Sequence, residues 1–214
     1  KKFANYWFHN EHLLVDGRKM SKSLGNFFTL RDLLKKGYVP MAIRYLLLSS
    51  NYRQQLNFTE ESVKAAASAL DRINEFIIKL KEMKNGGGNK KISSLIKKAK
   101  KDFEKEMDDD LGISNAIAHI FEFIKEINIL MSEGKIGKKD AKNILDLMQR
   151  FNEVLGVIDF REEKLESSLK KTIDEREKAR KEKDFAKADR IREELKAKGI
   201  ILEDTKGGVR WKKV

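Results

Sequence analysis

The sequence contains no cysteine and only one proline among its 214 residues. The lack of cysteine excludes a disulfide framework, a thiol nucleophile and a thiolate-bound metal within this stretch. A single proline, together with 13 glycines, excludes collagen-like and proline-rich disordered classes and favours long helices. No apolar run approaches the ~20 residues of a membrane-spanning helix. The first residues lack an initiator methionine and a signal-peptide core, so we expect a piece of a longer protein.

Positive charge exceeds negative charge, giving a formal net charge of +12. Residues 1–60 carry ten Lys and Arg against four Asp and Glu, residues 61–160 carry 18 against 17, and residues 161–214 carry 18 against 13. A basic excess at both ends suits a long polyanion that is contacted at two separated places. Solvated lysine-rich helices would give the same totals, so charge alone does not distinguish a polyanion-binding protein from one with a merely solvated basic surface.

Apolar periodicity predicts a mainly helical chain. The expected helices are 30–36, 40–50, 59–83, 92–107, 114–132, 138–155, 165–182 and 185–198. Thr29, Thr59 and Asp184 are the expected N-caps. Short strands are expected at 13–15, 200–202 and 209–211. The apolar stripes of the middle helices predict an antiparallel bundle, interrupted by a glycine-rich break at residues 85–89. The expected core positions are Ala66, Leu70, Ile73, Ile77 and Leu80 in helix 59–83, Ile117, Ile120, Phe121, Ile124, Ile127 and Leu130 in helix 114–132, and Ile144, Leu145, Met148, Phe151 and Leu155 in helix 138–155.

The segment Arg18 to Asn26 is the most specific part of the sequence. We expect a loop in which two lysines three residues apart, interleaved with two serines, converge if the chain makes one helical turn. Lysine is a compact cation that neutralises phosphate oxygens, and glycines on either side allow the loop to move. Such loops stabilise the charge that builds on a departing polyphosphate. On residue types alone, a solvated turn is the commoner interpretation.

Five consecutive residues, Lys19-Met20-Ser21-Lys22-Ser23, are identical to the KMSKS signature of class I aminoacyl-tRNA synthetases. Further segments resemble the cysteinyl-tRNA synthetase family, in order along nearly the whole chain. They are Tyr6–His9, Val15–Asp16, Leu24–Thr29, Ile43–Leu46, Asn51–Phe58, Met107–Leu111, Gly199–Asp204 and Val209–Lys213.

The resemblance implies a cytoplasmic enzyme that activates cysteine with ATP and Mg²⁺ and transfers it to tRNA-Cys. If the roles of the family's KMSKS motif apply at the matching positions, Lys22 contacts ATP, and Lys19, Ser21 and Ser23 complete the ATP-binding loop. Lys19 and Lys22 are then the catalytic residues, through phosphate positioning and charge stabilisation rather than acid–base chemistry.

The family's HIGH motif and its zinc site are absent from this sequence, so we expect no activity from this chain alone and zinc only in an upstream part. The sequence has three histidines, and a metal pair of His9 and His12 is rejected because a strand would place them on opposite faces. The implied fold is mainly α. A β and loop remnant of the catalytic domain occupies 1–58, a tRNA-binding helical bundle 59–160, and a small α+β anticodon-recognition domain 161–214.

The resemblance also implies that the last domain reads the anticodon. Recognition of single-stranded bases requires aromatic rings or guanidinium groups on which the bases stack, and polar side chains that hydrogen-bond to the base edges. The candidates are Arg180, Phe185, Asp189, Asp204 and Trp211. The two aromatic residues could equally form the core of this small domain.

Other charged residues have two interpretations each. Arg44 and Arg53 would contact the tRNA acceptor stem, or would pair with Asp32 or Glu60. The acidic run 108–110 is better explained by stabilisation of the next helix N-terminus than by Mg²⁺ binding.

Two further functions stay open. One is a stand-alone tRNA-binding module with a vestigial KMSKS loop. The other is a different class I synthetase. A HIGH motif and zinc ligands in the upstream reading frame would decide against the binding module.

Overall fold

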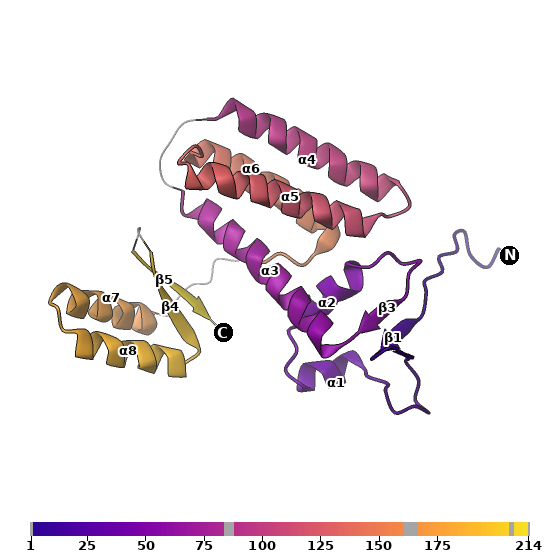
Figure 1. The fold of residues 1–214 in the computed structure, drawn as a ribbon, viewed down its shortest axis with the longest axis horizontal. Coiled ribbons are helices and arrows are strands. Elements are labelled where there is room, and N and C mark those ends of the chain that lie inside the picture. The colour runs from indigo at the N-terminus through magenta and orange to yellow at the C-terminus, as the bar shows by residue number, and fades with distance from the viewer. Residues whose placement is uncertain (1, 84–87, 161–166, 206–207, 214) are drawn as a thin grey trace. The chain divides into compact units, whose positions relative to one another are not determined.

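The computed structural model describes residues 2–83, 88–160, 167–205 and 208–213. The chain divides into two compact units, residues 1–160 and 161–214. The predicted domain boundary between residues 58 and 59 lies inside the first unit. It separates the expected catalytic remnant from the expected tRNA-binding bundle, and this division by function stays a prediction. Figure 1 shows the elements of each unit.

A small three-stranded sheet begins the first unit. Strand β1 (Leu13–Val15) pairs antiparallel with β2 (Arg18–Lys19) and parallel with β3 (Leu56–Phe58), in the order β2-β1-β3. The two-residue turn between β1 and β2 has positive φ at Asp16 (49°) and Gly17 (73°). Hairpin turns of this length favour such angles because their twist matches that of the strands.

The described residues of the first unit also form six helices. They are α1 (Leu30–Lys35), α2 (Pro40–Leu48), α3 (Glu60–Lys81), α4 (Lys90–Asp108), α5 (Ile113–Ser132) and α6 (Lys138–Leu155). The predicted caps are confirmed, because the hydroxyls of Thr29 and Thr59 accept hydrogen bonds from the amides of Asp32 and Ser62. Pro40 occupies the first turn of α2, where its missing N–H has no intrahelical partner to lose.

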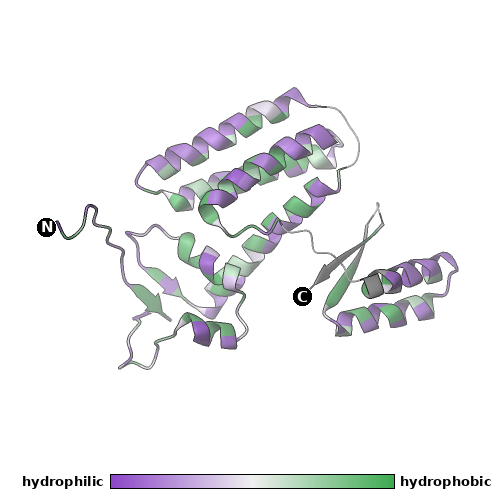
Figure 2. Ribbon diagram, turned by 180° about the vertical axis from the view of Figure 1, so that it is seen from behind, coloured by the Kyte–Doolittle hydropathy of each residue, from purple (hydrophilic) through white to green (hydrophobic). Residues whose placement is uncertain are grey.

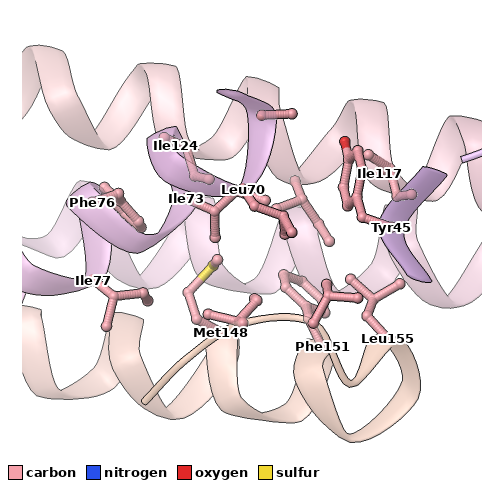
Figure 3. Packing of buried hydrophobic residues seen from close by; sticks show 14 of the residues in the cluster. Tyr45, Leu70, Ile73, Phe76, Ile77, Ile117, Ile124, Met148, Phe151 and Leu155 are labelled. Atoms are coloured by element: carbon pink, nitrogen blue, oxygen red, sulfur yellow. The ribbon is translucent and has the colours of Figure 1, made fainter. Parts of the chain in front are cut away.

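Helices α3 to α6 pack around one apolar core, to which α2 adds Tyr45 (Figure 3). The core positions of α3 that the sequence predicted are buried: Ala66, Leu70, Ile73, Ile77 and Leu80. In α5 and α6, Phe123 and Leu147 are buried in place of the expected Phe121 and Leu145, which are half-buried. Figure 2 shows the resulting division into hydrophobic and hydrophilic helix faces.

A buried carboxylate joins the first turns of α4 and α6. Asp140, only 4% exposed, accepts hydrogen bonds from the backbone amides of Asn89 (3.1 Å) and Gly137 (3.2 Å). The side-chain amide of Asn89 also donates to the carbonyl oxygen of Lys135. Backbone donors that a helix start leaves without intrahelical partners are thus satisfied.

The second unit is a helical hairpin followed by a two-stranded antiparallel sheet. Its elements are α7 (Ser167–Lys181), α8 (Phe185–Ala197), β4 (Ile200–Thr205) and β5 (Gly208–Lys213). Asp184 caps α8 as predicted, by accepting a hydrogen bond from the amide of Lys187. The core of this unit contains Ile173, Ile191, Leu195, Ile200 and Leu202.

The mainly helical class predicted from the sequence is confirmed, as are its eight helices within the described residues. Two strands differ from the prediction. Residues 18 and 19 belong to β2 rather than to a loop, and β3 was not predicted. No helix in the described part of the chain has both the length and the apolar character needed to cross a membrane.

Candidate nucleotide and RNA contact sites

The KMSKS loop, defined here as residues 19–26, starts from a hairpin that the sheet holds in place. The amide of Gly17 donates to the side-chain oxygen of Asn57 in β3 at 2.8 Å, and the amide of Asp16 donates to the carbonyl oxygen of Phe58. Met20 packs against the core and donates its amide to the carbonyl oxygen of Leu13. The start of the loop is therefore fixed while its tip projects from the unit.

Asn26 closes the loop. Its side-chain oxygen accepts the amide of Ser21 at 2.9 Å, and its side-chain nitrogen donates to the carbonyl oxygen of Lys19 at 3.2 Å. Between these contacts, residues 22–25 form a turn in which the amide of Gly25 donates to the carbonyl oxygen of Lys22. Gly25 has φ of +69°, which glycine adopts without steric cost. Sequence reasoning missed Asn26 because its role depends on the loop's conformation.

The two lysines of the loop are exposed and are supplied by different local structures. Lys19 lies in β2, and Lys22 lies in the following turn with its Nζ 5.5 Å from the centre of the Phe27 ring. Lys19 and Lys22 therefore do not share the single helical turn that was considered from the sequence. Among the residues the structure describes, no carboxylate forms an ion pair with either ammonium group.

The two serines of the motif hydrogen-bond to each other. Their hydroxyl oxygens lie 2.8 Å apart, and the Ser21 hydroxyl also accepts the amide of Leu24 at 3.3 Å. Ser21 is half-buried while Ser23 is exposed. The hydroxyl pair therefore shapes the turn that carries Lys22.

Arg53 has a partner that the sequence did not suggest. Its guanidinium donates to both carboxylate oxygens of Asp110, at 2.6 and 3.3 Å, and the Tyr52 hydroxyl donates to the same carboxylate at 2.6 Å. The hydrogen bonds from Arg53 and then Tyr52 lower the pKa of Asp110. The pKa of Tyr52 is raised, chiefly because its hydroxyl donates to the carboxylate. Asp32, one of the two partners expected from the sequence, instead accepts from Thr29.

Glu60 and Arg44 each have a partner that the sequence did not suggest either. Glu60 pairs with Lys64 at 2.6 Å, and Arg44 donates to the carbonyl oxygen of Leu155 at 2.9 Å. Asp110 lies before the N-cap of α5, Gly112, and the first turn of that helix holds no acidic residue. The carboxylate of Asp110 is held instead by Arg53 and Tyr52, so stabilisation of the helix start stays a prediction for the acidic run.

An open groove of about 460 Å³ lies between the N-terminal segment, the end of α2 and the α4–α5 turn. Phe8, Leu48, Tyr52 and Leu111 are among the residues that line it. The KMSKS loop does not line this groove, so the groove is not the nucleotide site that the motif predicts.

The described residues bring no three metal-ligating side chains together. The sequence has no cysteine and only three histidines. Of these, His119 forms a hydrogen bond with Glu122 at 3.1 Å and lies on the surface of the bundle. This donor set does not fit a zinc site, and no zinc chemistry is assigned to this chain.

The predicted anticodon residues in the hairpin of the second unit are exposed. Arg180 lies near the end of α7, and Phe185, which is 60% exposed, begins α8. Asp189 follows Phe185 by one helical turn and is also exposed. The interpretation of Phe185 as a core residue is therefore wrong. Asp204 and Trp211 lie in β4 and β5, where Trp211 pairs with Leu202 in the register.

Models of known protein families match most of the chain. Three family models match in order: the class I (C) tRNA synthetase catalytic domain over residues 1–68, the DALR domain over 102–159, and the cysteinyl-tRNA ligase anticodon binding domain over 163–211. The chain belongs to the cysteinyl-tRNA synthetase family and matches the C-terminal portion of its members.

Curated relatives match the whole chain. A cysteine–tRNA ligase of Protochlamydia amoebophila is 42% identical over 215 residues, covering 100% of this chain and 45% of the relative. One of Brachyspira hyodysenteriae is 43% identical over 222 residues, covering 100% and 46%. The chain thus spans about half the length of the curated relatives it matches.

A solved structure shares the fold. It is the LeuRS of Agrobacterium radiobacter in a ternary complex with tRNA and LeuAMS, with a TM-score of 0.50 and 19% identity. The match covers 68% of this chain and 21% of that one. At this identity the likeness concerns the fold alone.

Proposed function

We propose that this chain supplies the KMSKS loop and the tRNA-binding parts of a cytoplasmic cysteine–tRNA ligase. The complete enzyme joins cysteine to AMP with release of pyrophosphate from ATP, and then transfers cysteine to tRNA-Cys. The observation that carries the proposal is the pair of exposed lysines, Lys19 and Lys22, on a loop that Asn26 and the sheet hold in one shape. An uncompensated ammonium group is suited to a polyphosphate because it need not first break an ion pair.

In this proposal Lys22 neutralises charge on the ATP phosphates as pyrophosphate departs, and Lys19 adds a second positive charge. Ser21 and Ser23 keep the turn in shape through their mutual hydrogen bond and complete the ATP contact. Mg²⁺ accompanies ATP as its counterion. The energetic effect is electrostatic, since preorganised cations stabilise charge that develops in the transition state. The HIGH motif, the cysteine pocket and its zinc belong to an upstream part of the enzyme.

The second unit is proposed to bind the anticodon. Exposed Phe185 offers a ring for a base to stack on, and Arg180 and Asp189 offer a donor and an acceptor nearby on the hairpin. Asp204 and Trp211 are assigned to the same surface by the family resemblance. The match of residues 163–211 to an anticodon binding domain supports this assignment.

The test of the nucleotide half is Lys22→Ala in the complete enzyme. We expect ATP–pyrophosphate exchange to fall by on the order of 10²-fold, as when one transition-state donor is removed, with tRNA-Cys affinity nearly unchanged. Lys36→Ala is the matched control, because Lys36 is also a lysine over an aromatic ring, 4.1 Å from the Phe28 centroid, but lies outside the loop. Unchanged exchange in Lys22→Ala would refute the assignment.

The tRNA half is tested on this chain by filter binding with tRNA-Cys and other tRNAs. A clear preference for tRNA-Cys supports the proposal. Equal binding of all tRNAs favours a general RNA-binding module instead, and a reading frame without upstream HIGH and zinc motifs would favour such a module as well.

A further inference from the structure

The turn of the β1–β2 hairpin is bound to strand β3 by a side chain as well as by backbone. Figure 1 shows β1 and β3 beside each other near the start of α3. Beyond the strand pairing, the amide of Asp16 donates to the carbonyl oxygen of Phe58 at 3.2 Å. The next amide, that of Gly17, donates to the side-chain oxygen of Asn57 at 2.8 Å, across 40 positions of sequence. Both residues of the turn therefore donate to β3.

Asn57 lies between residues whose positions are fixed by packing and capping. Leu56 is half-buried and Phe58 is buried, whereas Asn57 is exposed, as the alternation of a strand requires. Thr59 follows as the N-cap of α3, and its hydroxyl accepts the amide of Ser62. The backbone of Asn57 is therefore held from both sides, and its side-chain amide has a defined place beside the turn.

Strand β2 cannot set its own register. It consists of Arg18 and Lys19, which are both exposed and charged, so no hydrophobic face selects how they pair with β1. The observed register pairs Leu14 with Lys19 and Val15 with Arg18. In a hairpin the turn fixes the register, and a slip of one residue moves every side chain to the other face of the sheet. The conformation of the turn therefore decides the face on which Lys19 lies.

The turn needs contacts from outside itself. Its first residue, Asp16, has φ of +49°, a region that residues other than glycine seldom adopt. Gly17 follows with φ of +73°. An acceptor that is already in place for the Gly17 amide favours this conformation over others that the short hairpin could adopt.

We propose that Asn57 is a positioning residue for adenylate formation. Its side-chain oxygen holds the hairpin turn, and the turn sets the register of β2. Strand β2 in turn presents Lys19 and leads into the turn that carries Lys22. Cations stabilise a transition state best when they are in place beforehand, so misplaced lysines lower the rate. This inference rests on the proposed function, because it requires the KMSKS lysines to act on ATP.

The contact uses Asn57 as an acceptor. Its side-chain nitrogen has no hydrogen-bond partner among the residues that the structure describes, while its oxygen accepts from Gly17. Aspartate has nearly the same shape and keeps an acceptor oxygen, whereas leucine keeps the branched shape without an acceptor. Asn57→Leu should therefore lose the positioning and Asn57→Asp should keep it. A role in packing alone would not separate these two variants.

The first arm of the test measures the turn in this chain by hydrogen exchange and NMR. We expect the Gly17 amide to exchange about three- to tenfold faster in Asn57→Leu, as loss of one ordinary hydrogen bond implies, and at nearly the unmodified rate in Asn57→Asp. Asn51→Leu is the matched control, because the Asn51 side-chain oxygen also accepts a backbone amide, that of Arg53 at 2.9 Å, but outside the hairpin. Equal Gly17 exchange in Asn57→Leu and Asn51→Leu would overturn the inference.

The second arm measures ATP–pyrophosphate exchange by the complete enzyme. We expect Asn57→Leu to lower kcat by about three- to tenfold with the KM for cysteine nearly unchanged, and Asn57→Asp to restore it. In an enzyme that already carries Lys19→Ala, Asn57→Leu should cost less than in the unmodified enzyme, because one of the groups that it positions is gone. Losses that simply multiply would show that Asn57 acts independently of Lys19 and would overturn the inference.

The two proposals fail separately. If Lys19→Ala and Lys22→Ala lose exchange activity while Asn57→Leu loses none, the positioning role is wrong and the nucleotide role of the lysines stands. If both lysine variants keep full activity, the proposed nucleotide function is wrong, and Asn57 then has no part in the reaction even where the Gly17 amide is released.

Discussion

Arg53 and Asp110 lie 57 positions apart in the chain and share a two-point contact, with the guanidinium Nε 2.6 Å from the carboxylate Oδ2. The contact joins the segment before β3 to the turn between α4 and α5. Asp110 and Leu111 both have positive φ, at 52° and 56°, which non-glycine residues seldom adopt. The hydrogen bonds of Arg53 and Tyr52 thus hold this turn in an otherwise unfavourable backbone conformation.

A pH dependence follows from the lowered pKa of Asp110, which Arg53 and then Tyr52 cause by hydrogen bonding. An aspartate in the unfolded chain titrates near pH 3.9, at about its ordinary value. Because the folded pKa is lower, the contact contributes its full stability above the unfolded pKa and loses it as pH falls through the folded pKa. We expect Asp110→Asn to lower the urea midpoint at neutral pH, by an amount that shrinks below about pH 4.

Urea titrations of both proteins at several pH values measure this difference. Asp108→Asn is the control, since it removes the same charge two residues earlier, at an exposed position of α4. A gap between Asp110→Asn and the unmodified chain that stays constant down to pH 3 would contradict the prediction.

The Arg53 contact also shows where sequence reasoning stops. The partners suggested from the sequence, Asp32 and Glu60, are both occupied locally, by Thr29 and Lys64. Helix caps such as Thr59 are predictable because the capping contact spans three residues. The partner of Arg53 depends instead on how α4 and α5 return to the sheet, which no local pattern contains.

The KMSKS loop divides in the same way. The sequence motif gives the positions of the lysines and serines in the loop. It predicts neither strand β2 nor the hydrogen bonds of the Asn26 side chain. Strand β2 has only two residues, and both are exposed and charged, so it has no hydrophobic alternation. Its pairing depends on the turn at Asp16 and Gly17, and the bridge of Asn26 depends on that pairing.

Asn26→Ala tests whether this side chain fixes the loop. We expect the amide of Ser21, which loses its acceptor, to exchange with solvent faster by at least about tenfold, a difference of about 1.4 kcal/mol in opening free energy. Hydrogen exchange followed by NMR measures it. The matched control is Asn10→Ala, because within the described residues the side chain of Asn10 donates to the carbonyl oxygen of its neighbour Glu11 and to no other group. Protection of Ser21 that is the same in both variants would show that the loop holds its shape without Asn26.

Asp140→Ala tests the joint between α4 and α6. The substitution leaves the amides of Asn89 and Gly137 without their acceptor at a buried site, so we expect a loss of about 1–3 kcal/mol in unfolding free energy. Asp140→Asn keeps one acceptor oxygen and should lose less. Chemical denaturation followed by circular dichroism gives both values. Asp146→Ala on the exposed side of α6 should lie within about 0.5 kcal/mol of the unmodified chain.

Phe185→Ala separates a recognition role from a packing role in the second unit. The ring is 60% exposed, so its removal should change unfolding free energy by less than about 0.5 kcal/mol. If a base stacks on it, affinity for tRNA-Cys falls by about 1–3 kcal/mol, as alanine substitution at stacking positions commonly shows. Ile201→Ala is the matched control, because Ile201 is an exposed apolar residue of the same unit and is 40% exposed. Filter binding gives the affinities, and thermal denaturation gives the stabilities.

Equal affinities for both variants would remove Phe185 from the anticodon surface. A stability loss in Phe185→Ala that matched its affinity loss would instead assign the ring to packing. Only a selective loss of tRNA affinity agrees with a ring left exposed for an RNA base.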